Sequence, residues 1–402
     1  MTDASHLGPG ARGADLEEHE RALELCTYCP KMCRFSCPVA EATGQESATP
    51  WALMGLANLV RKGHLPLTPE IARSFYNCTN CLLCREHCLH ANDVPAALRT
   101  ARTLAVAQGV IPPEGAAVLA RMRSQGSMFG EGDREALAAG MPAGVIDPGS
   151  LTALFVSCRS AWRRTPAVES ASALAGAGER CALADPTVRC CGAPLLDLGF
   201  AGDFAELAKR NAQALSRYES VICDSALCAR TLEREYPKAG VPLKARVIDL
   251  VTALDAALPP AVLLRLPRFP QRAVYHDPCH LGRHAGIYDA PRRLAEALFV
   301  KPLGEFAWSR ERASCCGGSG GFPFVNPATA ARLARALVDQ AREAGFDLIV
   351  TGSEECAAML EEGLGETRAG SNASPGRDPA PAAKGAIKVR TVASLLAEAF
   401  GR

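Results

Sequence analysis

CTYCPKMCRFSCP, residues 26–38, places four cysteines within twelve residues and follows the last one with a proline. A second run, CTNCLLCREHC at residues 78–88, contains four more. The two spacings are C-x2-C-x3-C-x3-C-P and C-x2-C-x2-C-x3-C. Cysteines at this density indicate either a disulfide framework or a metal site, and the rest of the chain decides between the two.

Composition and charge describe a globular protein of several domains. The chain has 402 residues, of which 48% are hydrophobic, and this length predicts two or three domains. Lys and Arg number 44 against 43 Asp and Glu, which leaves a net charge of +1. A chain without a basic field is not expected to bind nucleic acid.

The cellular compartment follows from what the sequence lacks. Residues 1–20 are polar and charged, which predicts a flexible arm and no secretory signal. The most apolar stretch, from Val247, is interrupted by Asp249, Asp255 and two prolines, so no membrane span is expected. We predict a cytoplasmic chain, whose 18 cysteines stay reduced and serve metal or redox chemistry.

The spacing of both runs is typical of two-cluster ferredoxins. In those proteins three thiolates of a tight loop hold one iron–sulfur cube, and the fourth reaches the other cube. The pattern implies two [4Fe-4S] clusters, one held by Cys26, Cys29, Cys33 and Cys88 and the other by Cys78, Cys81, Cys84 and Cys37. The first run has one extra residue between its second and third cysteines, and Leu89 stands where proline is usual. Two zinc sites are the alternative.

The segment between the runs predicts the type of ferredoxin domain. PWALMGLANLVRKG, from Pro50, has apolar residues at helical spacing, namely Trp51, Leu53, Met54, Leu56, Leu59 and Val60. We expect this helix to pack under the clusters. A long helical insert favours an α-helical ferredoxin domain over residues 21–105, followed by a connector with short helices over 106–150.

From Leu151 strand-like and helical stretches alternate, which predicts parallel βαβ units. The pattern occurs twice, so we predict two duplicated α/β domains, at 151–256 and 272–402, joined by a linker at 257–271. Residues 366–385 are of low complexity and predict a surface loop. Each copy places cysteines after strands, at the sheet edge where such folds bind ligands: Cys158, Cys190, Cys191 and Cys228 in the first, and Cys279, Cys315, Cys316 and Cys356 in the second.

Two copies of Cys…Cys-Cys-Gly…Cys behind an eight-cysteine ferredoxin domain resemble a known family. YHDPCHLGRH (275–284) and CCGGSGGF (315–322) carry the resemblance to fused iron–sulfur proteins of heterodisulfide reductase, glycolate oxidase and anaerobic glycerol-3-phosphate dehydrogenase type. The resemblance implies one or two further clusters bound by these eight cysteines. It also implies a partner FAD-linked oxidase or dehydrogenase, with quinone or a membrane anchor as a further contact.

One departure bears on function. The family motif ends in C-x-x-C, but here Ser225 and Ser353 occupy the first of those positions. Cys223 offers a substitute in the first copy, whereas Thr351 stands in that place in the second. Five thiolates per copy are what the family uses to attack a disulfide, so the serines argue against that activity.

We therefore predict an oxidoreductase subunit that transfers electrons between a partner flavin-dependent dehydrogenase, of 2-hydroxy acid or glycerol-3-phosphate type, and quinone or another carrier. It would lie in the cytoplasm or, through its partner, on the inner face of the plasma membrane. The alternatives are a thiol-disulfide oxidoreductase like heterodisulfide reductase, and a structural metal protein. The chain shows no flavin, nicotinamide or nucleotide site of its own.

Other residues near these motifs receive plainer interpretations. His276, His280 and His284 surround Cys279, and we expect them to tune a cluster through hydrogen bonds more than to ligate it. GGSGG at 317–321 spells a nucleophile elbow, but glycines after a Cys-Cys pair are better explained by positive φ. Cys181 lies outside the duplicated set and is expected to be a buried apolar residue.

Overall fold

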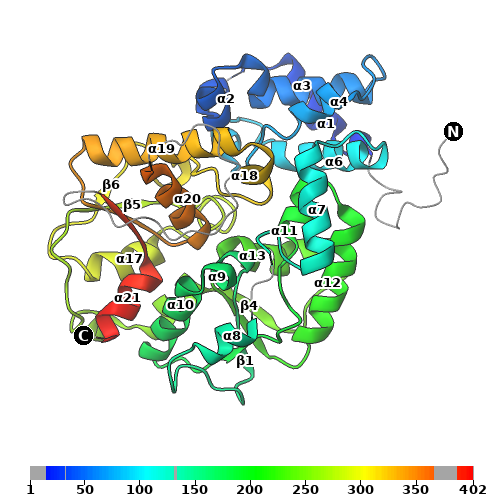
Figure 1. The fold of residues 1–402 in the computed structure, drawn as a ribbon. Helices are drawn as coiled ribbons and strands as arrows, with labels where there is room; N and C mark the ends of the chain where they lie inside the picture. Colours follow the sequence, from blue (N-terminus) through cyan, green and yellow to red (C-terminus); the bar gives the residue numbers. More distant parts are fainter. Residues whose placement is uncertain (1–14, 32, 131–133, 366–386, 402) are drawn as a thin grey trace.

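A computed structural model describes residues 15–31, 33–130, 134–365 and 387–401. The chain forms a helical part at its amino-terminal end and two parts that each contain a parallel sheet (Figure 1). The predicted arm lies within residues 1–14 for the most part, outside the described residues. Asp15 caps a 3-10 helix (Leu16–His19) whose Leu16 is buried, so the ordered chain begins before residue 21.

The amino-terminal part contains helices and loops and, among its described residues, no strand. Its main helices are α1 (Glu20–Tyr28), α2 (Pro38–Thr43), α3 (Pro50–Arg61), α4 (Pro69–Ser74), α5 (Leu83–Glu86) and α6 (Val94–Ala107). Proline in the first turn and a side-chain cap start several of them: Thr49 caps α3, Thr68 caps α4 and Asp93 caps α6. An α-helical ferredoxin-type domain is therefore confirmed.

Helix α3 packs against the cysteine loops with only some of its apolar residues. Leu53 and Met54 are buried in a core that also contains Cys26 and Cys84. Leu59, in contrast, is 40% exposed. The helix therefore packs against the cysteines with the face that Leu53 and Met54 mark, and the apolar residues outside that face are only partly covered.

The connector contains two helices, α7 (Pro113–Gln125) and α8 (Arg134–Ala139). Gly126, with φ of +68°, ends α7 in the left-handed conformation that glycine adopts without strain. Val118 and Met122 of α7 pack into the core of the first sheet. The connector is thus part of the folded body.

The first Cys-Cys-Gly domain contains a four-stranded parallel sheet of order β2-β1-β3-β4. Its strands are β1 (Thr152–Phe155), β2 (Ala182–Leu183), β3 (Ser220–Cys223) and β4 (Arg246–Asp249). Its helices are α9 (Cys158–Arg163), α10 (Thr165–Gly176), α11 (Ala193–Leu198), α12 (Ala201–Leu215), α13 (Ala226–Arg230), the π-helical turn η5 (Thr231–Glu235), α14 (Tyr236–Lys238), α15 (Leu250–Ala257) and α16 (Pro260–Leu263).

The second Cys-Cys-Gly domain has a parallel sheet of order β6-β5-β7-β8. Its strands are β5 (Ala273–His276), β6 (Gly304–Glu305), β7 (Leu348–Thr351) and β8 (Lys388–Thr391), and its main helices are α17 (Asp289–Ala297), α18 (Phe322–Val325), α19 (Pro327–Glu343), α20 (Glu354–Leu364) and α21 (Val392–Gly401). The two sheets share one strand order. The predicted loop at 366–385 falls outside the described residues.

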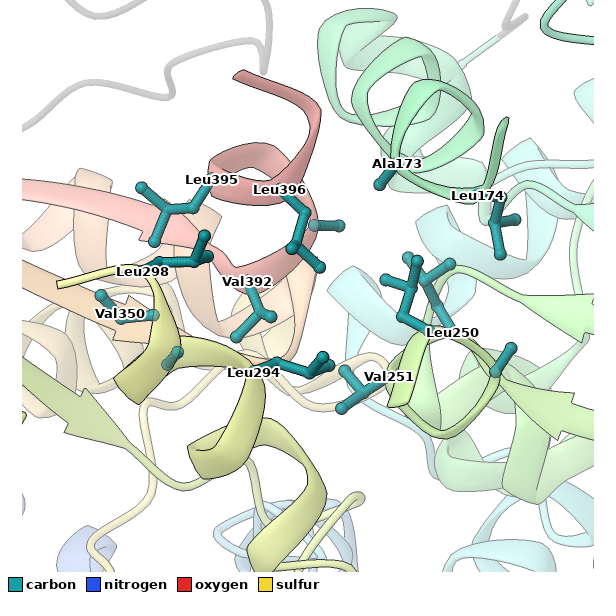
Figure 2. Close-up of a cluster of buried hydrophobic side chains, with 14 of the residues drawn as sticks. Ala173, Leu174, Leu250, Val251, Leu294, Leu298, Val350, Val392, Leu395 and Leu396 are labelled. Carbon is teal, nitrogen blue, oxygen red and sulfur yellow. The ribbon is translucent and has the colours of Figure 1, made fainter. Parts of the chain in front are cut away.

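A continuous apolar core joins the two sheet-containing domains (Figure 2). Leu174 and Leu250 come from the first domain, and Leu294, Val392 and Leu396 from the second. Because each fully buried Leu or Val contributes about 1.5–3 kcal/mol, this shared core holds the domains in one arrangement. The predicted linker at 257–271 also contributes to it, through Leu263 and Phe269.

Candidate functional site

Four thiols of the ferredoxin domain gather beside α1. The pKa of Cys26 is raised to about 11, mainly by burial and in smaller part by the neighbouring Cys33, Cys88 and Cys29. The Asn92 amide donates a hydrogen bond to Cys26 Sγ at 3.2 Å. Cys88 of the second run thus lies with three cysteines of the first, and we call these residues the Cys26 group: Cys26, Cys29, Cys33 and Cys88.

The complementary four thiols line one cavity between α2, α3 and the loop before α5. Burial raises the pKa of Cys37, and Cys81 and Cys78 add to the effect. The N–H of Asn80 donates to Cys78 Sγ at 3.4 Å, and Asn80 and Leu82 take positive φ values of 58° and 62° to curl the loop around the cavity. We call this set the Cys37 group: Cys37, Cys78, Cys81 and Cys84.

The two groups provide the donor set that an iron–sulfur cube requires. Each offers four thiols, and the Cys37 group surrounds a cavity. Burial is the main cause of the raised pKa of Cys26 and of Cys84, so iron would have to displace protons that these two sulfurs otherwise keep near neutral pH. The residues present therefore fit two [4Fe-4S] clusters, with each run sending its fourth cysteine to the other group.

In the first Cys-Cys-Gly domain the cysteines converge beyond the ends of β1 and β3. Cys158 opens α9, and its Sγ lies 3.7 Å from Cys190 Sγ. The Cys191 thiol interacts with Cys228, which lies on α13. Cys223, the last residue of β3, belongs to the same buried cluster. We call these five residues the first-domain site.

The second Cys-Cys-Gly domain repeats this arrangement. Cys316 Sγ lies 3.1 Å from Cys356 Sγ on α20, and the Cys315 thiol interacts with Cys279. Gly317 N donates to Cys315 Sγ at 3.4 Å, as Gly192 N does to Cys190 Sγ at the same distance. We call these four cysteines the second-domain site: Cys279, Cys315, Cys316 and Cys356.

The glycine after each Cys-Cys pair has a specific backbone role. Gly192 has φ of +88° and Gly317 has φ of +85°, a region that only glycine occupies readily. A Cβ on Gly317 would also come within 3.0 Å of the Ala330 backbone. The turn that presents the paired thiols thus requires glycine in both domains.

The three histidines near Cys279 have different environments. His276 is 1% exposed, and its Nε2 has no hydrogen-bond partner within the described chain. Burial lowers its pKa to about 4, so the ring is neutral near pH 7. His280 Nε2 and Ser319 Oγ share a hydrogen bond of 2.8 Å, and His284 Nε2 donates to Asn80 O at 2.8 Å. His284 therefore contacts the ferredoxin loop, whereas His280 is bonded within its own domain.

Ser319 of the GGSGG stretch is not arranged as a nucleophile. It is buried, and its partner His280 has an Nδ1 without a hydrogen-bond partner in the part of the chain that the structure describes. A serine nucleophile needs a base that a third group orients, and no such group is found there. Gly317 and Gly320 instead show the positive φ expected of these glycines.

Ser225 and Ser353, which replace family cysteines, act within their own helices. The Ser225 hydroxyl accepts the N–H of Cys228 at 3.3 Å and so caps α13. The Ser353 hydroxyl donates to Glu355 Oε2 at 2.8 Å. Both serines are buried and engaged in local hydrogen bonds.

The ferredoxin domain touches the second-domain site directly. Cys81 of the Cys37 group packs with Leu83, Cys279 and Cys315 in one buried cluster. The Arg283 guanidinium donates to Cys81 O at 2.6 Å and to Ala313 O at 2.7 Å. A cysteine of the Cys37 group and two cysteines of the second-domain site thus lie in contact.

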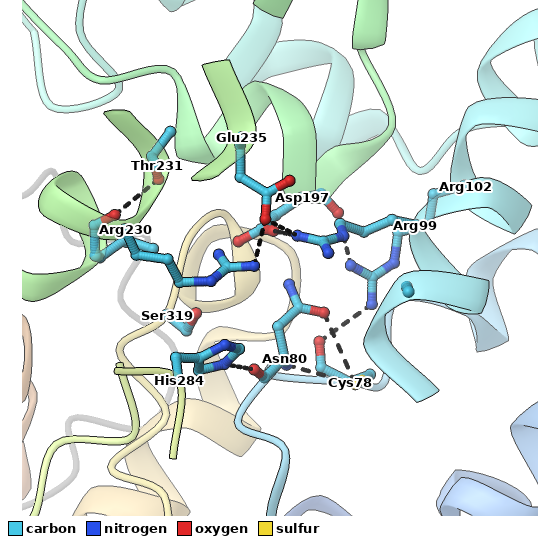
Figure 3. A network of polar contacts seen from close by, with 12 residues as sticks. Cys78, Asn80, Arg99, Arg102, Asp197, Arg230, Thr231, Glu235, His284 and Ser319 are labelled. Atoms are coloured by element: carbon cyan, nitrogen blue, oxygen red, sulfur yellow. Dashed lines mark hydrogen bonds and ion pairs between the residues drawn. The ribbon is translucent and has the colours of Figure 1, made fainter. Parts of the chain in front are cut away.

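Arg102 and Arg283 both hold the loop that carries Cys78 and Cys81, and Figure 3 shows the contacts of Arg102. Arg102 of α6 donates to Cys78 O at 3.1 Å, to Phe75 O at 2.9 Å and to Asp197 O of the first Cys-Cys-Gly domain at 2.6 Å. Behind it, Arg230 pairs with Glu235 at 2.6 Å. Arg102 on one side and Arg283 on the other fix the loop between the domains.

Buried carboxylates lie where the two Cys-Cys-Gly domains meet. Burial raises the pKa of Asp224 to about 7, while its Oδ1 accepts the N–H of Ser157 at 2.8 Å. Burial raises that of Glu354 to about 8, although Arg163 lies 2.7 Å away. Glu355 of the second domain contributes to the raised pKa of Cys158 and Cys228. The second domain therefore adds negative charge to the first-domain site.

Several of these residues carry no signal in the sequence. Arg102 and Asn92 stand outside any motif, and Arg283 lies within YHDPCHLGRH without a role that the motif indicates; all three act through contacts with distant parts of the chain. Cys181 is fully buried in the core shared by the two sheets, apart from the first-domain cluster. It is the buried apolar residue that its position predicts.

Comparison with known families defines the class of this protein. Residues 22–91 match the 4Fe-4S dicluster domain, and residues 152–233 and 273–361 match the cysteine-rich domain CCG. The chain is an iron–sulfur protein with a dicluster domain and two CCG domains, and iron–sulfur clusters are its cofactors, in place of the zinc alternative. It belongs to the iron–sulfur oxidoreductase subunits that share this organisation, a family that includes a subunit of heterodisulfide reductase.

Individual relatives match most of the chain at low identity. A fumarate reductase (CoM/CoB) subunit of Methanothermobacter marburgensis is 27% identical, over 87% of this chain and 70% of the relative. A dihydromethanophenazine:CoB–CoM heterodisulfide reductase subunit of Methanosarcina barkeri is 26% identical, over 83% and 79%. EtfAB:quinone oxidoreductase of Syntrophomonas wolfei is 25% identical, over 73% and 44%.

A solved structure of a hypothetical protein from Helicobacter pylori has a related fold, with a TM-score of 0.50 at 10% identity over 98% of this chain and 77% of that one. Among the described helices of this chain, none combines the length and apolar character that a membrane span needs.

Proposed function

We propose that this chain is the electron-transfer subunit of a flavin-dependent dehydrogenase of 2-hydroxy acid or glycerol-3-phosphate type. Electrons would leave a partner FAD-linked subunit, pass through the ferredoxin domain and reach the second Cys-Cys-Gly domain, for delivery to quinone or another carrier. The complex would lie in the cytoplasm or on the inner face of the plasma membrane. The EtfAB:quinone relative supports a quinone acceptor.

The observation that carries this proposal is the contact between Cys81 and Cys315. Iron–sulfur clusters supply one-electron chemistry when bound, and their potentials depend on charge, hydrogen bonds and solvent exposure. This chain's own residues would bind the clusters with thiolates, exclude water by burial, and hold two sites together through Arg102 and Arg283. Electrons would thus enter the Cys-Cys-Gly part through its second domain.

We also propose the assignments on which this route depends. The Cys26 group and the Cys37 group would each ligate one [4Fe-4S] cluster, and the eight Cys-Cys-Gly cysteines would ligate one or two more. The functional domains would be residues 21–105, 151–256 and 272–402. The common strand order of the two sheets and the matching Gly192 and Gly317 turns support an internal duplication.

Thiol-disulfide reduction is the second candidate, because one relative carries the name of a heterodisulfide reductase. Ser225 and Ser353 speak against it. A serine hydroxyl is a hard and weakly acidic donor compared with a thiol, and both hydroxyls are already engaged in local hydrogen bonds. The carrier function therefore agrees better with the observed sites.

The test uses anaerobically purified full-length protein. We expect at least about eight irons per chain, and more when the Cys-Cys-Gly sites are loaded. Reduced protein should pass electrons to a quinone analogue or a flavoprotein but should not turn over small disulfides. Steady disulfide turnover that Cys316→Ala abolishes would establish the reductase instead, and stoichiometric zinc with negligible iron would overturn both.

A further inference from the structure

The second-domain site contains one donor more than its four cysteines. The ligand atoms of His276, Cys316 and Cys356 all lie within 4.8 Å of one another. A tetrahedral metal with bonds of about 2.0–2.3 Å to nitrogen and sulfur places its ligand atoms about 3.5–3.8 Å apart. The three donors therefore already lie together, as the protein ligands of one metal centre do.

His276 has no other evident use for this nitrogen. The residue is 1% exposed, and Nε2 has no hydrogen-bond partner among the described residues. Buried polar atoms are nearly always paired, so an unpaired one needs an explanation. Its neighbour Phe306 contacts the ring edge-on, with 6.2 Å between centroids, and offers no hydrogen bond. An imidazole nitrogen of His276 lies next to two thiols, and Nε2 is the one that has no hydrogen-bond partner among the described residues.

The first-domain site shows what His276 replaces. In the first sheet Phe155 ends β1 and pairs in register with Cys223 of β3. In the second sheet His276 ends β5 and pairs with Thr351 of β7. Each domain thus has one metal-binding side chain at this level of the sheet. In the first domain this side chain is the Cys223 thiol on β3, and in the second domain it is the His276 imidazole on β5.

We propose that His276 Nε2 ligates iron of the cluster in the second Cys-Cys-Gly domain, beside Cys316 and Cys356. The inference rests on the proposed function, because it requires a cluster at this site. Each domain then offers five donors: five thiols in the first-domain site, and four thiols with one imidazole in the second. A neutral imidazole in place of a thiolate leaves the site less negative, which raises its reduction potential.

The test is pulsed EPR of full-length protein labelled with 15N-histidine. We expect a strong nitrogen coupling to one cluster, which His276→Gln removes. His280→Gln is the matched control: His280 is also buried in the same segment, but its Nε2 already has a partner, so the coupling should persist. The ferredoxin cluster signals should be unchanged in both variants.

A second variant keeps the test decisive when His276→Gln folds poorly. His276→Cys should retain the cluster, lose the nitrogen coupling and lower the reduction potential of that cluster relative to the wild type. A wild-type cluster at the second-domain site without nitrogen coupling, or with coupling that survives His276→Gln, overturns the His276 ligation and leaves the carrier function standing. Wild-type iron of about eight per chain, with none at this site, overturns the His276 ligation and leaves the two ferredoxin clusters of the proposed carrier in place.

Discussion

The first and second Cys-Cys-Gly domains can be compared residue by residue. Both place a Cys-Cys pair before a glycine with φ near +85°, Gly192 and Gly317, and both have a thiol on the helix after the central strand. They differ at the last residues of the two central strands of each sheet, where Phe155 pairs with Cys223 in the first domain and His276 pairs with Thr351 in the second. The Cys-Cys-Gly turn requires the same backbone conformation in both domains, whereas the metal-binding side chain at the strand ends differs between them.

The surroundings of the two sites differ as well. Cys315 of the second domain contacts Cys81 of the ferredoxin domain. The first-domain thiols Cys158 and Cys228 interact with Glu355, a carboxylate of the second domain that also acts on Cys356 of its own domain. A site beside another cluster is suited to receive electrons, and a site beside buried carboxylates is suited to hold a different potential. The comparison therefore predicts two sites with separate roles.

The largest effect is expected from Cys37→Ser. This variant removes a donor of the Cys37 group, which is the group in contact with the second-domain site. We expect loss of about four irons and a fall in electron delivery to the second domain of at least about a hundredfold, with the Cys26 group's EPR signal retained. Iron analysis and stopped-flow reduction measure both. If the Cys26 group's signal alone disappears, the cross-ligated pairing is incorrect.

Cys316→Ser and Cys191→Ser form a matched pair, one in each Cys-Cys-Gly domain. Each should remove the cluster of its own domain and leave the other, and Cys316→Ser should slow reduction of an external quinone analogue by the larger factor, about tenfold or more, because its domain touches the ferredoxin domain. Cys181→Ser, a buried thiol outside both sites, serves as the control. If either variant empties both domains, they share one site and the comparison fails.

Arg283→Met should weaken the docking of the ferredoxin domain on the second domain. Arg283 donates to Cys81 O, Glu311 O and Ala313 O, and its loss leaves buried carbonyls unpaired, at a cost of about 2–4 kcal/mol. We expect a lower thermal midpoint and faster proteolysis between the domains. Arg312→Met changes an exposed arginine nearby and should have little effect. An unchanged thermal midpoint in both variants would show that the hydrogen bonds of Arg283 do not hold the two domains together.

The smallest expected effect is on stability and concerns the ion pair of Arg230 and Glu235 in the first domain. Among the described residues, the second domain has no equivalent of this pair. Burial would raise the pKa of Glu235, but Arg99, Arg230 and Lys238 outweigh it and hold the pKa below its ordinary value of 4.5. A carboxyl with a lowered pKa stabilises the fold above 4.5, and this contribution disappears as the pH falls through the lower, folded-state pKa. The equivalent position in the second domain, Gly363, packs against Ala334.

We therefore expect Glu235→Gln to lower stability by about 1–3 kcal/mol near pH 7, since it leaves Arg230 without its partner. The difference from the wild type should narrow below pH 4.5. Thermal unfolding at pH 7, 5.5 and 4 measures it, with Glu233→Gln as the control because Glu233 is exposed. A difference that is constant with pH would mean that the charge of Glu235 does not contribute.

The sequence predicts the architecture well, because cysteine spacing and strand–helix alternation are local patterns. The helical ferredoxin domain, the two parallel sheets and their cysteine-bearing edges follow from such patterns. The clamp does not. Arg102 and Arg283 bond the backbone of a loop that comes together with them only after folding, and a single arginine has no periodicity.

The contacts of His276 could not be predicted from the sequence either. The sequence places it close to Cys279, but its nitrogen lies beside Cys316 and Cys356, which come from later in the chain. Likewise, nothing in the sequence indicates that Glu355 reaches the first-domain site. Such contacts depend on how neighbouring strands and domains are placed, and only the three-dimensional structure contains that information.

The enclosed loop at residues 78–84 has a consequence for how the protein is made. Cys81 and Cys84 are buried, and Arg102 and Arg283 bond the loop backbone from opposite sides. We therefore expect iron and sulfide to reach this loop before the second Cys-Cys-Gly domain docks on it. Because that domain leaves the ribosome after the ferredoxin domain, synthesis would keep the loop open for metal delivery, and maturation would have an order that the chain direction imposes.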